Sequence, residues 1–232
     1  SVGAPFAVAS ATAPLLQAWY ARTGREDAHD PYYLYAASNL GSFAGLLAYP
    51  ILVEPLVGLS DQTGLWTLGY LTVAVFIAAA GAIALSWRRP ETTIEDAPPA
   101  VKLSWNQRLY WIGAAAIPSS LILGVTQHIS TDVASAPFLW VLPLALYLLT
   151  FVIAFARGGE RIAPIVLIAH PVSLALLVIS YFSHGDFIWS LLANLLCFFL
   201  SALICHLALA RTRPAVGGLT EFYLWVSVGG VV

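Results

Sequence analysis

Long apolar runs that alternate with short polar junctions are the feature that most limits the fold of this chain. Only 9% of its residues are charged and 59% are hydrophobic, whereas an ordinary soluble domain carries about 25% charged residues. A membrane-spanning helix needs about 20 mostly apolar residues, and eight such segments follow one another. They cover 1–20, 31–59, 64–87, 106–131, 133–156, 164–183, 187–210 and 219 to the end. The sequence predicts an all-α, polytopic transmembrane helix bundle with about eight spans.

The composition excludes several other classes of protein. A soluble globule could not hide this much apolar surface, because more than half of a folded surface is exposed whatever the sequence. A disordered chain would be far less hydrophobic. A nucleic-acid interface needs a basic surplus, but ten basic residues here face twelve acidic ones. We therefore expect the lipid bilayer, and no nucleic acid, among the partners.

The basic residues all fall at alternate junctions between the predicted spans. They are Arg22, Arg25, Arg88, Arg89, Lys102, Arg108, Arg157, Arg161, Arg211 and Arg213. If every span crosses the membrane once, all ten lie on one side, which the positive-inside rule assigns to the cytoplasm. The predicted cytoplasmic loops are 21–30, 88–108, 157–163 and 211–218.

One junction is much longer than the others. Residues 88–104 contain three prolines and charges of both signs, a composition typical of a flexible linker. We predict a three-span membrane segment at 1–87, a cytoplasmic linker at 88–104, and a five-span membrane segment at 105–232 whose last span is truncated. The chain has no Met and starts within an apolar run, so we expect an internal fragment of a longer protein.

The acids away from the basic junctions are the first candidates for a functional site, because ionisable groups in membrane proteins often mark one. Glu54 lies between Pro50 and Pro55. A carboxylate beside carbonyls freed by a broken helix is a cation site in transporters; the alternative is an interfacial kink whose Glu faces water. Asp132 either caps the following helix or forms a proton-sensitive pair with His128, one turn earlier. Two ligands are too few for a metal site.

The second apolar segment contains a polar residue next to a row of small ones. Ala37, Gly41 and Gly45 lie four residues apart, a spacing that lets helix backbones approach closely. We therefore predict helix packing on this face. Asn39 is expected to hydrogen-bond a neighbouring helix, and contact with a substrate is the alternative. Cys197 and Cys205 are eight residues apart on one predicted helix, about 12 Å of rise, which excludes a disulfide.

The sequence contains no recognisable catalytic or cofactor motif. It has no phosphate-binding loop, no zinc-ligand spacing, no plausible Ser–His–Asp set and no Gly-rich nucleotide turn. We therefore predict no cofactor, no metal and no enzyme activity.

Several stretches resemble a bacterial membrane-protein family. They are DPYYLYAASNLGS at 30–42, YPILVEPL at 49–56, TDVASAP at 131–137, Cys205-His206 and LTEFYLW at 219–225. The chain resembles the membrane portion of spermidine-synthase-like multi-span proteins, a family of fused transporter-superfamily and spermidine-synthase proteins. The resemblance implies the bacterial inner membrane. The soluble aminopropyltransferase domain of many members is absent from these 232 residues, which is a further reason to expect no enzyme activity here.

Two functional hypotheses follow from these features. The first is a transporter-like domain for a small cationic solute such as a polyamine, with Glu54 and Asp132 attracting the cation, His128 beside Asp132, and Asn39 orienting it. The second is a non-catalytic accessory or scaffold subunit of a larger membrane complex. It is favoured by the near absence of charge in mid-span, which a proton-coupled carrier would usually need.

Overall fold

The architecture is that of a computed structural model, which describes residues 3–21, 23, 25, 28, 30–86, 103–133, 139–182 and 187–231. The side chains of 3–10, 132 and 133 also lie outside the described set. The predicted linker at 88–104 falls almost wholly outside it. Only its last two residues are described, and the Ser104 hydroxyl accepts a hydrogen bond from the Gln107 N–H (3.3 Å), which caps the next helix.

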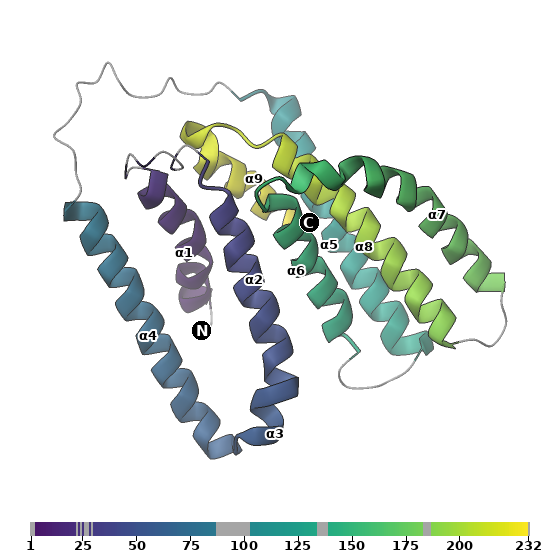
Figure 1. Cartoon of the computed structure of the whole chain (residues 1–232), viewed down its shortest axis with the longest axis horizontal. Helices are drawn as coiled ribbons and strands as arrows, with labels where there is room; N and C mark the ends of the chain where they lie inside the picture. The colour runs from purple at the N-terminus through teal and green to yellow at the C-terminus, as the bar shows by residue number, and fades with distance from the viewer. Residues whose placement is uncertain are drawn as a thin grey trace.

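Most of the described residues are helical, and no strand occurs among them. Each predicted apolar segment is helical. The main helices are α1 (Gly3–Ala21), α2 (Tyr33–Ala48), α4 (Leu59–Ser86), α5 (Trp105–His128), α6 (Val141–Phe155), α7 (Ala163–Phe182), α8 (Phe187–Arg211) and α9 (Leu219–Val231). Successive helices run in opposite directions (Figure 1). The all-α prediction is therefore confirmed.

Five of these helical stretches are long and apolar enough to cross a membrane. They are Tyr33–Leu56, Leu59–Ser86, Trp105–Thr131, Gly159–Phe182 and Phe187–Arg211. The helix α6 has 15 residues and α9 has 13, which is less than the roughly 20 that a full span needs. The described chain thus has the apolar helices of an integral membrane protein.

The second apolar segment is not broken by its prolines. After α2, the π-helix η1 (Tyr49–Val53) and the short helix α3 (Glu54–Leu56) continue in the same direction. Pro50 lacks an N–H, and the wider π turn accommodates it without ending the helix. The segment ends at Val57, whose backbone is extended (φ −122°, ψ 122°). The expected break is therefore a widened turn.

A similar π turn shifts the start of the fifth predicted segment. The π-helix η3 (Ile129–Val133) extends α5, so residue 133 belongs to the preceding helix, and α6 begins only at Val141. Of the helix predicted from 133, the structure describes the part from Val141 onward, and 134–138 lie outside the described residues.

The core lies where α2, α5, α6, α8 and α9 meet. The closest packed pairs are α5 with α9, α2 with α6, α7 with α8, and α8 with both α5 and α6. Trp111 of α5 and Phe222 of α9 are completely buried, with their rings edge to face at 5.0 Å. Gly229 allows α9 to approach α5 closely, because a Cβ there would collide with the Ile112 carbonyl oxygen. Figure 1 shows α4 apart from this core, beyond α1.

Candidate functional site

Two facing helices hold a buried histidine in one defined tautomer. His206 of α8 is fully buried, and its Nδ1 lies 2.8 Å from Thr150 Oγ1 of α6. The Thr150 hydroxyl already donates its single proton to the Tyr147 carbonyl oxygen at 2.6 Å. Thr150 must therefore accept from His206 Nδ1–H. This leaves Nε2 of His206 as a bare lone pair inside the bundle.

No residue in the described part of the chain hydrogen-bonds that lone pair. The Phe151 ring stacks on the imidazole at 3.6 Å between centroids, and the Tyr147 ring meets it edge-on at 5.2 Å. An unpaired acceptor in an apolar interior costs about 1–3 kcal/mol. The described residues contain no group of three His, Cys, Asp or Glu able to hold a metal ion. The surroundings of Nε2 thus suit an N–H or O–H donor.

A second buried polar side chain enters from α1. Gln17 is fully buried, and its Oε1 accepts a hydrogen bond from the Tyr223 hydroxyl of α9 at 2.8 Å. Its Nε2 has no partner among the described atoms. Rotating the amide by half a turn would exchange the two atoms, so one polar atom of Gln17 lacks a partner in either orientation.

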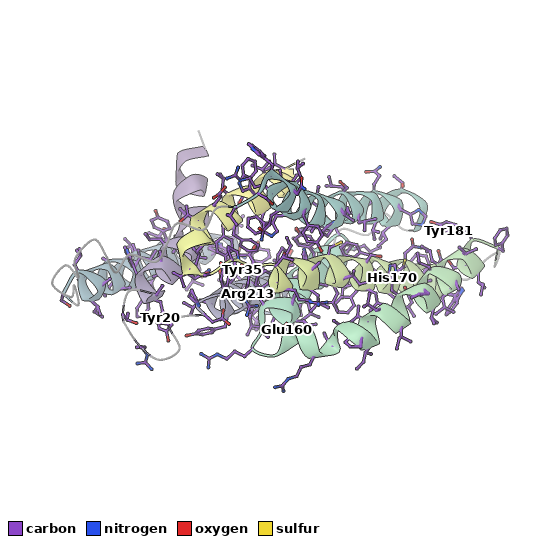
Figure 2. The ribbon with its side chains drawn as sticks, turned by 90° about the horizontal axis from the view of Figure 1, so that it is seen from above. Tyr20, Tyr35, Glu160, His170, Tyr181 and Arg213 are labelled. Carbon is purple, nitrogen blue, oxygen red and sulfur yellow. The ribbon has the colours of Figure 1, made fainter. Side chains whose placement is uncertain are left out.

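Aromatic rings connect these two side chains. Tyr35 of α2 lies 5.0 Å from Tyr223 and 5.4 Å from Phe151 between ring centroids, and Phe151 stacks on His206. In Figure 2, Tyr35 lies in the middle part of the molecule, between Tyr20 and His170. We call this continuous set the buried polar layer, and it consists of Gln17, Tyr35, Tyr147, Thr150, Phe151, His206 and Tyr223.

A cavity of about 290 Å³ borders the layer at Tyr147. It lies between α5, α6 and the end of α9, and its polar lining consists of Ser119, Ser120 and the Tyr147 side chain. Ser119 Oγ and the Tyr147 hydroxyl are 3.2 Å apart. Tyr147 thus touches both the cavity and the His206 ring. The cavity is close to the lower limit of about 300 Å³ for small-molecule sites.

Charged groups close the layer at one end. Arg213 forms an ion pair with Asp30 (2.9 Å) and lies over the Tyr32 ring (5.5 Å). The Tyr32 hydroxyl donates to the Pro214 carbonyl oxygen at 2.8 Å. The Arg213 and Asp30 charges next to the layer therefore pair with each other and sum to zero.

The basic residues gather at one end of the helices, as predicted. Those that the structure describes are Arg25, Arg108, Arg157, Arg161, Arg211 and Arg213. Contacts join their junctions: Arg157 lies 4.3 Å over the Tyr33 ring, and Arg108 pairs with Glu221 at 2.6 Å. Arg22, Arg88, Arg89 and Lys102 lie outside the described residues. The α1, α4, α6 and α8 helices all end at this side of the molecule (Figure 1).

The site residues expected from the sequence lie elsewhere and on separate elements. Glu54 is exposed at the start of α3, and His128 ends α5, its ring 6.2 Å from that of Tyr181. Asp132 is in the π-helix η3, and its side chain lies outside the described set. Asn39 donates to the Tyr35 carbonyl of its own helix at 2.8 Å, rather than to the neighbouring helix that we expected.

The small-residue face of α2 is open. Ala37 is exposed, and a Cβ added at Gly41 or Gly45 would meet nothing within 4 Å among the described atoms. The α2 helix packs on α6 through a different face, which includes the buried Ala36 and the Tyr35 ring against Phe151 and Phe155. The predicted packing on the small face therefore has no partner helix in the described chain.

The buried polar layer was not predicted as a site. Its signal was present, because Gln17 and His206 are polar residues within apolar segments, where such groups are costly. The carboxylates Glu54 and Asp132 were predicted as the site instead. Comparison with protein-family models, curated proteins and solved structures finds no match for this chain. Its function must therefore be argued from the layer, the cavity and the charges.

Proposed function

We propose that this chain is a membrane-embedded domain of transporter type that binds a small cationic solute, such as a polyamine, in the buried polar layer. The observation that carries the proposal is the unpaired His206 Nε2 lone pair between the Phe151 and Tyr147 rings. An ammonium group has donors and no acceptor. It can donate to a bare lone pair, and cation–π attraction adds about 2 kcal/mol where a desolvated ion lies over a free ring face.

The shape of the layer supports a linear solute with a donor at each end. Gln17 lies at one side of the layer, and His206 at the other, with the Tyr35 and Phe151 rings between them. If the Gln17 amide is turned by half a turn, so that Nε2 donates to the Tyr223 hydroxyl oxygen, its amide oxygen is free and both sides present an acceptor. The cavity at Tyr147 supplies space beside the layer.

Charge at the opposite end of the molecule supports a cation as well. Glu54 and Asp61 are exposed at the turn between α3 and α4, and no described residue of that turn is basic. Acidic surface raises the local concentration of cations. In this proposal the outer acids, Asp132 among them, attract the solute and the layer binds it.

The proposal includes eight membrane crossings and a bacterial inner-membrane location, with the arginine-rich end in the cytoplasm. It also includes membership of the spermidine-synthase-like membrane family that the sequence resembles. Arg25→Cys and Gly58→Cys, made singly in a chain that also carries Cys197→Ala and Cys205→Ala, should react with an impermeant thiol reagent from opposite sides. Reaction from the same side would contradict the topology.

Transport is tested with the purified chain in liposomes loaded or surrounded with radiolabelled spermidine. Uptake above protein-free liposomes is expected, and its absence would overturn the transport assignment. His206→Phe keeps an aromatic ring in the stack but removes the lone pair, so uptake should fall about tenfold or more. Thr72→Val on exposed α4, whose hydroxyl bonds its own helix, is the control and should transport normally.

The role of the outer acids is tested separately. Glu54→Gln combined with Asp132→Asn should lower uptake at low salt and have little effect at high salt, because attraction at a distance is screened. Unchanged uptake at every salt concentration would remove these acids from the mechanism and leave the layer proposal standing. His128→Gln is measured in the same uptake assay, and a lower uptake would show that the His128 ring takes part in attracting the solute.

The accessory-subunit hypothesis also has a specific observation in its favour. None of the most apolar 18-residue window of α4 is buried, and the small face of α2 is open. Both surfaces suit helix–helix docking in a complex. Gentle purification from the source membrane followed by native mass measurement separates the hypotheses. Stoichiometric association with another subunit would favour the accessory role, whereas a protein that purifies alone would favour the transporter.

A further inference from the structure

An open, apolar groove runs between α7 and α8. It has a volume of about 520 Å³, and its walls are almost entirely aliphatic. The side chains that form it include Ile165, Ile168, Val172, Leu176, Leu196 and Leu200. Ser173 is its one polar lining residue, and its hydroxyl donates to the His170 carbonyl oxygen at 2.7 Å. The groove therefore presents hydrocarbon and no free hydrogen-bonding group from its lining side chains.

The relative position of the two helices is set by one polar contact. Ser201 donates to the Cys197 carbonyl at 2.7 Å, so its oxygen accepts from His170 Nε2, which is 2.9 Å away. Residue 170 thus lies opposite residue 201 in antiparallel helices. Counting from this pair, Arg161 before α7 lies level with the last turn of α8, which ends at Arg211. The Ile165 end of the groove therefore points to the basic end of the molecule.

The length of the groove matches one leaflet of a bilayer. Ile165 and Leu176 are eleven residues apart on α7, which is about 16 Å at 1.5 Å per residue. The hydrocarbon core of a membrane is about 30 Å thick, so the groove covers about half of it. That is the depth of one acyl chain in the leaflet next to the arginines.

Positive charge is concentrated at this end of the groove. Arg161 precedes Ile165 by one helical turn, and the exposed Arg157 and Arg211 lie at the same junctions. Glu160 is the acidic residue in the turn, so the sum there is positive. Between Arg161 and Arg211 the sequence contains no other basic residue, and Asp186, at the opposite junction, is the only acid. Figure 2 places Glu160, which marks this turn, away from Tyr181 at the far end of α7.

We propose that this groove is a binding site for an anionic phospholipid. One acyl chain lies along α7 and α8 from Ile165 to Leu176, and the phosphate group binds the guanidinium groups of Arg161 and Arg211. Arginine suits this role because its planar fork of donors matches phosphate oxygens. A groove that is apolar along one leaflet and basic at that leaflet's surface complements an amphiphile with a negative head. The site is independent of the proposed solute site.

The test measures phospholipid binding by the purified full chain in non-ionic detergent, with native mass spectrometry and dioleoyl phosphatidylglycerol or dioleoyl phosphatidylcholine as the probes. The chain should retain phosphatidylglycerol at least about tenfold more tightly than phosphatidylcholine. Arg161→Gln combined with Arg211→Gln should abolish this preference. Arg25→Gln, a basic residue of another junction, is the matched control and should leave it unchanged. Equal retention of the two lipids by the unmodified chain would overturn the proposal.

A second pair of variants tests the groove without touching the charges. Ala169→Phe fills the groove and should weaken phosphatidylglycerol binding about tenfold, whereas Ala74→Phe on exposed α4 should have no effect. Val172→Phe serves the same purpose if Ala169→Phe does not yield a monodisperse protein. Loss of binding in the arginine variant but full binding in both groove variants would show a headgroup site only and would overturn the groove assignment. Tight binding of a second copy in place of lipid, seen as a dimer mass, would overturn it too.

Discussion

The packed core and the α4 helix, which lies apart from it and is called the α4 arm below, are similarly apolar in sequence. They differ in how much of that apolar surface is buried inside the protein. In α8, 39% of the most apolar window is buried inside the protein, whereas in α4 none of it is. The α8 helix contacts α5, α6 and α7. Among the described helices, α4 packs on α1, where Gly81 lies against the Trp19 ring, and its first turn accepts a hydrogen bond from the Tyr49 hydroxyl at Gln62. Hydrophobicity alone therefore does not decide which helix builds the interior.

Removing the largest core side chain should break the core and leave the arm unaffected. Trp111 is fully buried, and its indole N–H donates to Thr212 Oγ1 at 3.1 Å. Trp111→Ala should lower the free energy of unfolding by about 3–5 kcal/mol. Trp66→Ala on α4, where the ring is 66% exposed, is the control and should cost little. Unfolding in mild detergent followed by near-UV circular dichroism measures both, and equal losses would contradict the distinction between core and arm.

Replacing glycine by alanine should change the stability of the protein in opposite directions at two positions. Gly229→Ala pushes a methyl group into the Ile112 carbonyl of α5 and should destabilise the protein by about 1–3 kcal/mol. Gly41→Ala has open space and should stabilise α2 by about 0.5–1 kcal/mol, since alanine loses less backbone freedom in a helix. The midpoint of thermal unfolding in detergent reports both changes. A stabilised Gly229 variant would mean that α9 does not approach α5 so closely.

Replacing the buried histidine separates stability from function. In His206→Phe the unpaired lone pair disappears and the ring stack with Phe151 remains, but Thr150 loses a partner. The two effects oppose each other, each about 1 kcal/mol, so the unfolding free energy should change by less than about 1 kcal/mol. A loss of several kcal/mol in the same detergent unfolding assay would assign His206 a purely structural role.

The smallest effect is expected at the edge of the core. Arg108 pairs with Glu221 and also lies 4.7 Å over the Trp105 ring, in a partly exposed position. Glu221→Gln should cost no more than about 1 kcal/mol, and the cost should shrink at high salt because exposed charges are screened. Unfolding measured at two salt concentrations tests this. A cost that does not depend on salt would indicate that Glu221 acts mainly through its hydrogen bond with Trp225.

The helical segments and their basic ends were predictable because both depend on runs along the chain. An apolar stretch of about 20 residues between polar junctions specifies a helix. A basic residue such as Arg157 or Arg211 identifies a junction from the sequence alone, whatever its contacts in the folded protein. The inner face of each helix was not predictable, because helices that are apolar on all sides carry no stripe that points to the core. The buried polar layer depends on which faces meet. Gln17 and Tyr223 are 206 residues apart, and no spacing rule joins them.

The place of α9 in the chain has a consequence for how the protein assembles. Tyr223 completes the layer, Phe222 packs on Trp111, and Tyr32 binds the Pro214 carbonyl just before α9. These contacts join residues far apart in sequence, so they carry the highest loop-closure cost and form late. During synthesis from the N-terminus, α1, α2 and α5 must wait in the membrane with their future contact surfaces uncovered until α9 arrives. The buried polar layer is thus completed only with the final folding step among the described helices.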